Sequence, residues 1–336
     1  MRVTLLMPNR NTAQLLDLVL DRLAASTTYP NAELLVVDDG STDASREIVR
    51  KRGSKLGALD LRLIEREHGG VVHALNAGLA EASGKLVVQL DSDVTIDSEG
   101  WLEKLIAFFC SHPSIGVVTA KVVFDWGELQ SCGVNVIGPS GLYDRGTELA
   151  EPIGQRTWHG AVRRPRSEEG ALCERIVEVD SGIGCCMMYR RDVALKVGGY
   201  DAGFSPVWFD DIDLCLSIRR AGLKVFFHPE VRVVHHVGAR IRRAQPTWRR
   251  VAGGVRRRAG ALSPAVARVL PPPRPQKERR ELLASHRRYW ETKWGFDILN
   301  PEMAAVQERW GDTEICWQMN PEMRAAGERV VQAYTG

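Results

Sequence analysis

Acidic side chains that directly follow apolar runs are the residues of this 336-residue chain best suited to do chemistry. Asp91 and Asp93 come after the apolar run at residues 85–90, and side chains two apart in an extended segment share a face. Both carboxylates can therefore address one site, and such hard oxygen ligands suit Mg²⁺ or Mn²⁺ completed by water and substrate phosphates. The alternative is a turn in which both aspartates accept hydrogen bonds from backbone amides.

A second acidic group stands in the first turn of a predicted helix and comprises Asp210, Asp211 and Asp213. Favourable interaction with the helix dipole, about 0.3–1 kcal/mol for an acid, readily explains one of them. Three acids beside the aromatic pair Trp208 and Phe209 favour a functional interpretation. In it an acid acts as a general base, and the aromatic side chains form walls that bind a sugar or a similar acceptor.

Asp39 follows a predicted strand and His235 ends another, and each has two interpretations. An acid after the second strand can bond the ribose or base of a nucleotide, or it can be a turn residue. His235 and His236 face opposite ways on a strand, so at most one of them enters a shared site. A histidine there is either a metal ligand or a structural residue with no part in the site. The first predicted strand leads into Pro8-Asn9-Arg10-Asn11 and not into G-x-G-x-x-G, which disfavours a nicotinamide enzyme.

The elements that must position these side chains follow a βαβ pattern over residues 1–120, where short apolar runs alternate with amphipathic stretches. This pattern predicts an α/β fold with a largely parallel sheet flanked by helices. The predicted strands lie at residues 2–7, 33–37, 61–64, 85–90, 116–119, 224–227 and 231–235, and the predicted helices include 72–82, 101–110 and 211–221. Because ligands of an open α/β sheet collect outside the carboxyl ends of its strands, the acidic groups should gather at one edge.

The segment 240–280 differs from the rest of the chain in charge. It holds thirteen Lys and Arg against one acid, Glu278, so it carries +12 and the remaining chain −9. Apolar residues at helical spacing among its arginines favour an interfacial helix on anionic lipid, and a solvated arm or a partner-binding surface is the alternative. The acidic body argues against nucleic-acid binding. Beyond this arm, Asn300-Pro301 and Asn320-Pro321 predict two helix starts.

The composition, with 44% hydrophobic and 26% charged residues, is that of a globular protein and excludes disordered, collagen-like and disulfide-scaffold classes. No apolar run approaches the roughly 20 residues that span a bilayer, and the N-terminus does not have the pattern of a signal peptide. Seven cysteines form an odd set without Cys-x-x-Cys. We therefore expect free, mostly buried thiols in a reducing cytoplasm, with the basic arm allowing peripheral contact at the inner membrane face.

Seven segments in this order resemble the family 2 glycosyltransferases of GT-A fold, over about residues 1–240. They are residues 3–11, 35–43, 74–79, 88–93, 198–201, 208–216 and 233–236. Gln130-Ser131-Cys132-Gly133 is also similar to the rhamnosyltransferase-like branch. The resemblance implies an inverting transfer of a sugar from a nucleotide-diphosphate sugar to an acceptor hydroxyl, in the synthesis of a glycan, polysaccharide or glycolipid.

The resemblance also implies roles for single residues. The residues expected to bind the nucleotide sugar are Pro8, Arg10, Asp39, Asn76 and Asp91, with Asp39 on the base, Asp91 on the ribose and Arg10 where an aromatic ring often stacks. Those expected to hold Mn²⁺ or Mg²⁺ are Asp93 and His235. Asp211 is the expected general base, with Asp210 in place of a more usual Glu, and Trp208 and Phe209 are expected to bind the acceptor.

The sequence thus predicts a GT-A domain with a Rossmann-like sheet and a helical C-terminal extension. Its parts are 1–120, the nucleotide-sugar-binding half; 121–240, the acceptor-binding and catalytic half; 241–280, the basic linker or arm; and 281–336, the extension. The expected partners are a nucleotide-diphosphate sugar, a sugar or lipid-linked glycan acceptor and an anionic membrane, with no nucleic acid. A non-catalytic nucleotide-sugar-binding module and a nucleotidyltransferase on a related fold are the alternatives.

Overall fold

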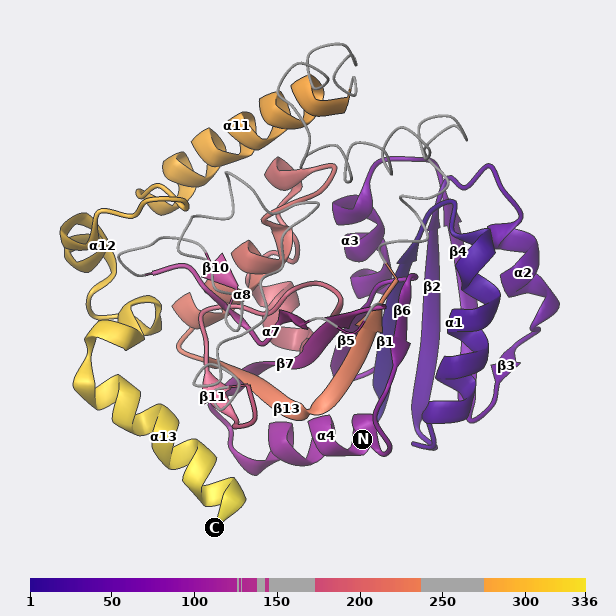
Figure 1. The fold of residues 1–336 in the computed structure, drawn as a ribbon, viewed down its shortest axis with the longest axis horizontal. Helices are drawn as coiled ribbons and strands as arrows, with labels where there is room; N and C mark the ends of the chain where they lie inside the picture. The colour runs from indigo at the N-terminus through magenta and orange to yellow at the C-terminus, as the bar shows by residue number, and fades with distance from the viewer. Residues whose placement is uncertain (126, 128, 138–142, 145–172, 237–274) are drawn as a thin grey trace, which may run out of the picture.

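The computed structural model describes residues 1–125, 127, 129–137, 143–144, 173–236 and 275–336 (Figure 1). Its centre is an eleven-stranded sheet. Nine of the strands follow one another in the order β11-β13-β7-β12-β5-β1-β2-β4-β3, and the other two are β6, which pairs with β13, and β8, which pairs with β7. Helices cover the sheet, which is mixed but mostly parallel, so the predicted α/β fold with a largely parallel sheet is confirmed.

The first half of the chain forms the parallel part of this sheet. Its elements are β1 (Val3–Asn9), α1 (Ala13–Ser26), β2 (Ala32–Asp39), α2 (Ser45–Lys51), β3 (Lys55–Leu56), β4 (Leu59–Arg66), α3 (Val71–Glu81), β5 (Leu86–Leu90), β6 (Val94–Ile96), α4 (Trp101–Ser111) and β7 (Ile115–Phe124). Strand β1 pairs in parallel with both β2 and β5. Every residue of β1 and β2 is buried, as expected for parallel strands covered by helices on both faces.

The next elements close the sheet around the carboxyl end of β5. They are β8 (Leu129–Ser131), β9 (Val134–Asn135), β10 (Tyr143–Asp144), β11 (Val177–Glu178), β12 (Cys186–Arg190), α7 (Arg191–Lys196), η1 (Ala202–Phe204), α8 (Asp210–Arg220) and β13 (Lys224–His235). Strand β12 lies antiparallel between β5 and β7. The two strands predicted at 224–227 and 231–235 are one strand, whose register shifts between His228 and Arg232. Pro229 lies in that irregularity, because proline has no N–H to donate to a ladder.

The C-terminal residues pack on the core through α11 (Pro275–Trp294), α12 (Met303–Trp310), η3 (Glu314–Met319) and α13 (Pro321–Thr335). In Figure 1 these elements lie at the opposite end of the molecule from α1 and α2. Trp290, Trp294 and Ile315 share a buried apolar cluster with Phe204 and Phe209. The predicted boundary at residue 281 falls inside α11, and most of the predicted basic arm, residues 241–274, lies outside the described residues.

One of the two predicted Asn-Pro helix starts is confirmed. The side chain of Asn320 accepts hydrogen bonds from the backbone N–H groups of Glu322 and Met323 and caps α13. The other prediction is wrong, because α12 begins at Met303, after Asn300-Pro301 has continued as irregular chain.

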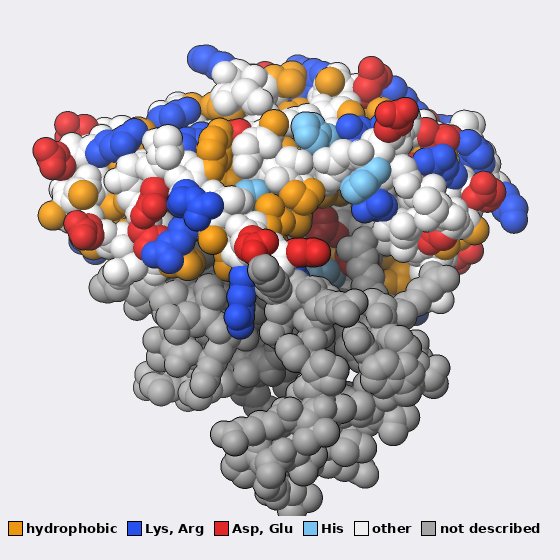
Figure 2. Space-filling model, turned by 90° about the horizontal axis from the view of Figure 1, so that it is seen from above, with side chains coloured by type: hydrophobic (Ala, Val, Ile, Leu, Met, Phe, Trp, Pro, Cys, Tyr) orange, Lys and Arg blue, Asp and Glu red, His pale blue; other side chains and the backbone are white. Residues whose placement is uncertain are grey.

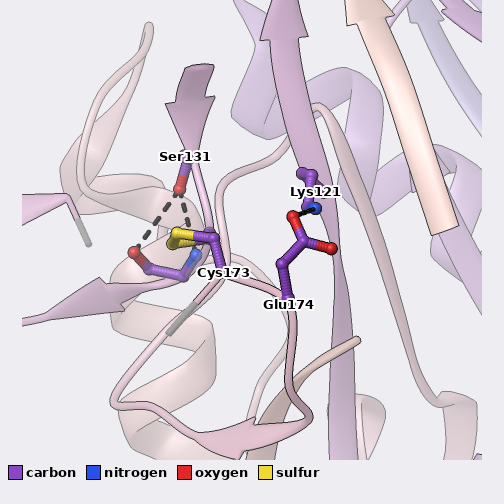
Figure 3. The surroundings of a disulfide bond; sticks show 6 residues. Lys121, Ser131, Cys173 and Glu174 are labelled. Atoms are coloured by element: carbon purple, nitrogen blue, oxygen red, sulfur yellow. Dashed lines mark hydrogen bonds and ion pairs between the residues drawn. A yellow bond between two sulfur atoms is a disulfide. The ribbon is translucent and has the colours of Figure 1, made fainter. Parts of the chain in front are cut away.

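The prediction that all seven cysteines are free is corrected by a disulfide between Cys132 and Cys173 (Figure 3). The two residues are 41 apart in sequence, and only the folded chain brings them together. An ion pair of 2.7 Å between Lys121 Nζ and Glu174 Oε1 lies beside the bridge. Because of this disulfide, cysteine usage no longer supports a reducing compartment. Four of the five free cysteines are buried, as predicted, and among the described residues no helix is long and apolar enough to cross a membrane.

Candidate active site

The strand ends bring Asp93 and His235 together, as the sequence predicted for a metal pair. Asp93 lies in the turn between β5 and β6, and His235 ends β13, which pairs with β6. The backbone N–H of His236 donates to the carbonyl of Asp93 at 2.8 Å and fixes this arrangement. His235 Nε2 consequently lies 3.4 Å from Asp93 Oδ1. His236 turns the other way and pairs with Thr95 Oγ1 at 2.9 Å, so only one histidine enters the site.

Two residues for which the sequence predicts no role in the site complete this group. Gln130 Oε1 lies 2.9 Å from His235 Nδ1, while Nε2 of the same ring faces Asp93. Cys185, just before β12, places its Sγ 3.4 Å from the same Nδ1. Potential ligand atoms of Asp91, Cys185 and His235 all lie within 4.8 Å of one another. In the sequence, Gln130 stands out only for a resemblance to one branch of the family, and Cys185, next to Cys186, is expected only as a buried thiol.

The donor set of this group fits a divalent cation. Three carboxylate or imidazole side chains, those of Asp91, Asp93 and His235, come from two different strand ends and converge. Carboxylate oxygens with an imidazole nitrogen are ligands that Mn²⁺ and related ions accept. Asp93 is buried, whereas Asp91 and His235 are partly exposed, so an ion has access from one side. Figure 2 shows acidic and histidine side chains in a recess on the face seen from above.

The first turn of α8 places a second pair of carboxylates beside the first. Asp211 Oδ2 accepts a hydrogen bond of 2.8 Å from the backbone N–H of Gly184, the residue before Cys185. Burial raises the pKa of Asp211 above the usual aspartate value. Burial, together with the charges of Asp211 and Asp91, raises the pKa of Asp210 well above its usual range. Gly184 and Cys185 link the two acidic groups, because the carbonyl of Cys185 accepts a hydrogen bond of 3.3 Å from the N–H of Asp91.

The aromatic residues before α8 have unusual backbone geometry. Trp208 and Phe209 have φ values of +87° and +67°, a conformation that typically costs about 1–3 kcal/mol for each such residue. Phe209 is only 6% exposed and packs against Phe204 and Trp290 of α11, so the structure gives it a packing role that differs from the predicted acceptor contact. Trp208 is half-buried, and the guanidinium carbon of Arg279 in α11 lies 5.4 Å from its ring centroid.

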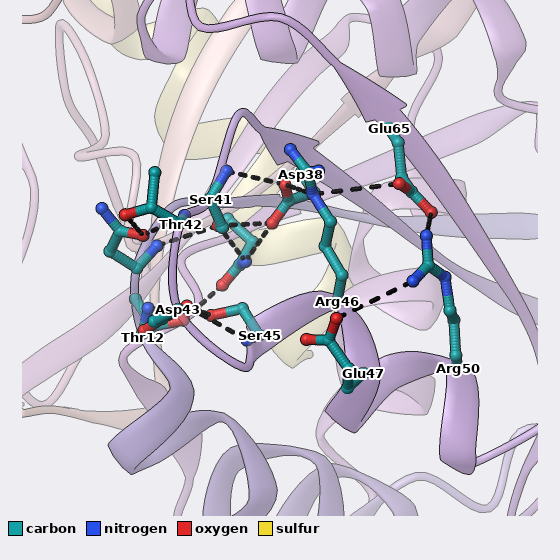
Figure 4. Close-up of polar contacts among 12 residues, drawn as sticks. Thr12, Asp38, Ser41, Thr42, Asp43, Ser45, Arg46, Glu47, Arg50 and Glu65 are labelled. Carbon is teal, nitrogen blue, oxygen red and sulfur yellow. Dashed lines mark hydrogen bonds and ion pairs between the residues drawn. The ribbon is translucent and has the colours of Figure 1, made fainter.

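Asp38 organises the turn after β2 (Figure 4). Its carboxylate accepts hydrogen bonds from the backbone N–H and hydroxyl of Ser41, from Asn9 Nδ2 and from Arg46 Nε. Burial raises its pKa, but these bonds outweigh the burial and lower the pKa overall. Asp38 is therefore a structural residue of this loop.

Asp39, the predicted base-contacting acid, is engaged by the loop after β4. It accepts hydrogen bonds from the backbone N–H groups of Gly69 at 3.0 Å and Gly70 at 2.9 Å, and from the side chains of Arg66 and His68. Burial raises its pKa, and these bonds together lower it. A nucleotide base would have to displace Arg66 or His68 from the carboxylate of Asp39. The predicted contact between Asp39 and the base stays a prediction.

The other predicted nucleotide residues lie along the same edge. Pro8 is buried in β1 opposite Val37, and Arg10 is exposed just after β1. Both ends of the side-chain amide of Asn76 pair with the backbone of Tyr200, at 2.6 and 2.9 Å, and its predicted contact with the nucleotide sugar stays a prediction. This pairing ties α3 to the turn after α7 and gives Asn76 a structural role.

Comparison with known proteins agrees with this geometry. The model of the family described as glycosyl transferase family 2 matches residues 4–198. An uncharacterized protein of Sinorhizobium fredii is 29% identical over 70% of this chain and 24% of its own length. An O-antigen biosynthesis protein of Myxococcus xanthus is 28% identical over 71% of this chain and 17% of its own length. A pre-mycofactocin glycosyltransferase of Mycobacterium tuberculosis is 29% identical over 69% of this chain and 42% of its own length. The chain thus spans less than half the length of these curated relatives.

Solved structures share the fold. A mannosyltransferase from Pyrobaculum calidifontis, solved with GDP-mannose and Mn²⁺, superposes with a TM-score of 0.51 at 21% identity and covers 99% of this chain and 85% of its own. GalNAc-T7, solved with UDP, GalNAc and Mn²⁺, gives a TM-score of 0.52 at 17% identity over 70% of this chain and 44% of its own. These similarities confirm the predicted GT-A-like architecture.

Proposed function

Because this chain belongs to glycosyl transferase family 2, we propose that it is an inverting glycosyltransferase that moves a sugar from a nucleoside diphosphate to an acceptor hydroxyl. One observation carries the proposal. Two pairs of carboxylates, Asp91 with Asp93 and Asp210 with Asp211, lie beside the start of β12. There the N–H of Gly184 donates to Asp211, and the carbonyl of the next residue accepts from the N–H of Asp91. His235, at the end of β13, lies 3.4 Å from Asp93. Transfer of a sugar needs a site for a charged leaving group and a base for the acceptor, and the two pairs can divide these tasks.

Asp93 and His235, with Asp91 beside them, would hold the divalent cation. Such a cation, Mn²⁺ or Mg²⁺, supplies positive charge that stabilises the diphosphate as the bond to the sugar breaks. The imidazole nitrogen of His235 favours Mn²⁺ over Mg²⁺, because Mg²⁺ prefers oxygen ligands. Gln130, beside Nδ1, would support this role by accepting the hydrogen of that nitrogen and leaving Nε2 to coordinate.

Asp211 would act as the general base. Burial raises its pKa, which makes the carboxylate a better proton acceptor, and the N–H of Gly184 holds it in position. The proton of the acceptor hydroxyl passes to Asp211 while the hydroxyl oxygen attacks the anomeric carbon opposite the leaving diphosphate, so the configuration inverts. A base in this position typically contributes about 10²–10⁴ in rate. Burial raises the pKa of Asp210 as well, so the pair would carry less negative charge than two exposed aspartates.

The flanking residues would bind the two substrates. Pro8, Arg10 and Asp39 would line the nucleoside pocket, where the planar guanidinium of Arg10 can stack on a nucleotide base. Trp208, in front of α8, would form the wall against the acceptor sugar. The product class we propose is a glycan, polysaccharide or glycolipid of the cell envelope, in line with the O-antigen protein among the relatives. Contact between residues 241–280 and an anionic membrane remains part of this proposal.

Release of nucleoside diphosphate from a panel of UDP-, GDP- and dTDP-sugars, with and without Mn²⁺, tests the function. The dTDP-deoxyhexoses belong in the panel because Gln130-Ser131-Cys132-Gly133 is similar to the rhamnosyltransferase-like branch. We expect Mn²⁺-dependent release from one donor, and an inverted anomeric signal in the proton NMR spectrum of the product. Donor binding without turnover over a panel of sugar and lipid-linked acceptors would favour a binding module, and release of pyrophosphate from a nucleoside triphosphate would favour a nucleotidyltransferase.

A further inference from the structure

Cys185 lies among the residues of the proposed metal site, and the mechanism above does not use it. Its side chain is buried, at 5% exposure, and its Sγ is 3.4 Å from His235 Nδ1. Together with Asp91 and His235 it forms a group whose possible ligand atoms all lie within 4.8 Å of one another. Within the described part of the chain, this is the one group of three His, Cys, Asp or Glu side chains so arranged.

The backbone around Cys185 fixes the thiol in this place. The N–H of Asp91 donates to the carbonyl of Cys185 at 3.3 Å, where β12 begins its antiparallel pairing with β5. On the other side, the N–H of Gly184 is held by Asp211. Because neighbouring residues of a strand face opposite ways, Cys186 is a natural comparison: it is fully buried but has no part in the group.

We propose that Asp91, Cys185 and His235 form a site for thiophilic divalent cations, Zn²⁺ above all, that shares His235 with the proposed Mn²⁺ site. One carboxylate, one thiolate and one imidazole are a typical ligand set for zinc, with a fourth position left for water or a substrate oxygen. Magnesium and manganese prefer oxygen and nitrogen ligands, so sulfur adds little to their binding. On zinc binding the S–H bond of Cys185 breaks, its proton leaves to solvent, and a zinc–sulfur bond forms.

This site has a consequence for the enzyme. Binding strength at a common set of ligands rises from Mn²⁺ to Zn²⁺, and a thiolate widens that difference. Zinc bound by Cys185 therefore competes with manganese for His235, the ligand that the two sites share, and inhibits transfer. The inhibition rests on the proposed function, whereas the binding of zinc rests on the geometry of the three side chains alone.

Spectroscopy with Co²⁺, which takes zinc's place and absorbs light, tests the binding directly. We expect the full-length metal-free protein to show a thiolate-to-cobalt charge-transfer band that Zn²⁺ abolishes by displacement. Cys185→Ser should lose the band and bind Zn²⁺ more weakly. The loss of affinity should be at least roughly 10–100-fold, which is the cost of removing a residue that only hydrogen-bonds to a metal ligand. Cys186→Ser, the matched control, should keep both. Two measurements would show that Cys185→Ser is folded. Its Mn²⁺ affinity should be near that of the wild type, and its circular dichroism spectrum should be unchanged.

Three results would overturn the site: no charge-transfer band in the wild type, equal Zn²⁺ affinity in Cys185→Ser and wild type, or the same loss in Cys186→Ser. If Cys185→Ser does not fold, Cys185→Ala gives the same readout. A cobalt–thiolate band in a protein that releases no nucleoside diphosphate from any donor would refute the proposed function and leave the metal site standing.

Discussion

The helix α8 that carries the proposed base is held by a buried ion pair with the C-terminal helix α11, and this pair yields a quantitative prediction. Lys293 Nζ lies 2.8 Å from Asp213 Oδ2 and 2.5 Å from Asp201 Oδ2, and Trp294 Nε1 donates to Asp213 Oδ1 at 2.9 Å. The side chain of Asp213 is fully buried, and that of Lys293 is 21% exposed. Substituting Lys293→Met keeps the apolar stem and removes the charge, so Asp213 is left without its cation.

Breaking a buried pair in this way typically costs about 3–5 kcal/mol of unfolding free energy. We expect the lower end, about 3 kcal/mol, because Trp294 still donates to Asp213 and because burial already raises the pKa of Asp213, so that it can take up a proton. A carboxyl whose folded pKa is raised destabilises the fold increasingly as pH rises. The deficit of Lys293→Met should therefore be largest near neutral pH and shrink as pH falls toward the raised pKa.

Chemical denaturation followed by circular dichroism and tryptophan fluorescence measures the effect. Lys55→Met is the matched control, because Lys55 pairs with Asp60 on an exposed edge and its loss should leave stability nearly unchanged. In Lys293→Met/Asp213→Asn part of the loss should return, since no charge is then left buried without a partner. A deficit of Lys293→Met no larger than that of Lys55→Met would refute the reasoning, as would a deficit that grows toward acidic pH.

The remaining predictions concern the proposed base and the contacts that support the site. Asp211→Asn should lower kcat by about 10²–10⁴ with donor affinity unchanged, and steady-state rates with a donor titration would check it. Wild-type kcat should fall as pH drops through the raised pKa of Asp211, because the protonated carboxyl cannot accept the acceptor's proton; an acid limb at the pKa of an ordinary aspartate would contradict this. Asp38→Ala should lose about 1.5–3 kcal/mol of unfolding free energy near neutral pH, the value of hydrogen bonds to a charged group. Because the folded pKa of Asp38 is lowered, that loss should vanish at acidic pH, where its contribution disappears in the wild type too. Reduction of the Cys132–Cys173 disulfide should lower the unfolding free energy by about 2–4 kcal/mol, and an unchanged denaturation midpoint in reductant would count against it.

Local patterns in the sequence account for much of the fold and for part of the site. Apolar runs locate the strand ends, and the rule that ligands gather at the carboxyl ends of parallel strands places Asp93 and its neighbours at one edge of the sheet. The start of α8 at Asp210 is likewise visible from its acids and periodicity.

Contacts between residues far apart in the chain could not be predicted, because no sequence pattern marks them. Gln130 reaches His235 across 105 residues, and Asn76 pairs with the backbone of Tyr200 across 124. Neither contact leaves a trace in hydrophobic period or turn chemistry. For the same reason the sequence predicts that Phe209 binds the acceptor, whereas α11, far along the chain, buries it.

The most direct test of the central claim is Mn²⁺-dependent release of nucleoside diphosphate by the wild type, Asp93→Asn and Asp97→Asn, with the donor and acceptor that the panel identifies. Asp97 pairs with Arg232 on the surface just past β6, so it controls for the loss of one acid near the site. The account predicts release that requires Mn²⁺, is lost in Asp93→Asn and is retained in Asp97→Asn. Release that is independent of Mn²⁺ and undiminished in Asp93→Asn would contradict it.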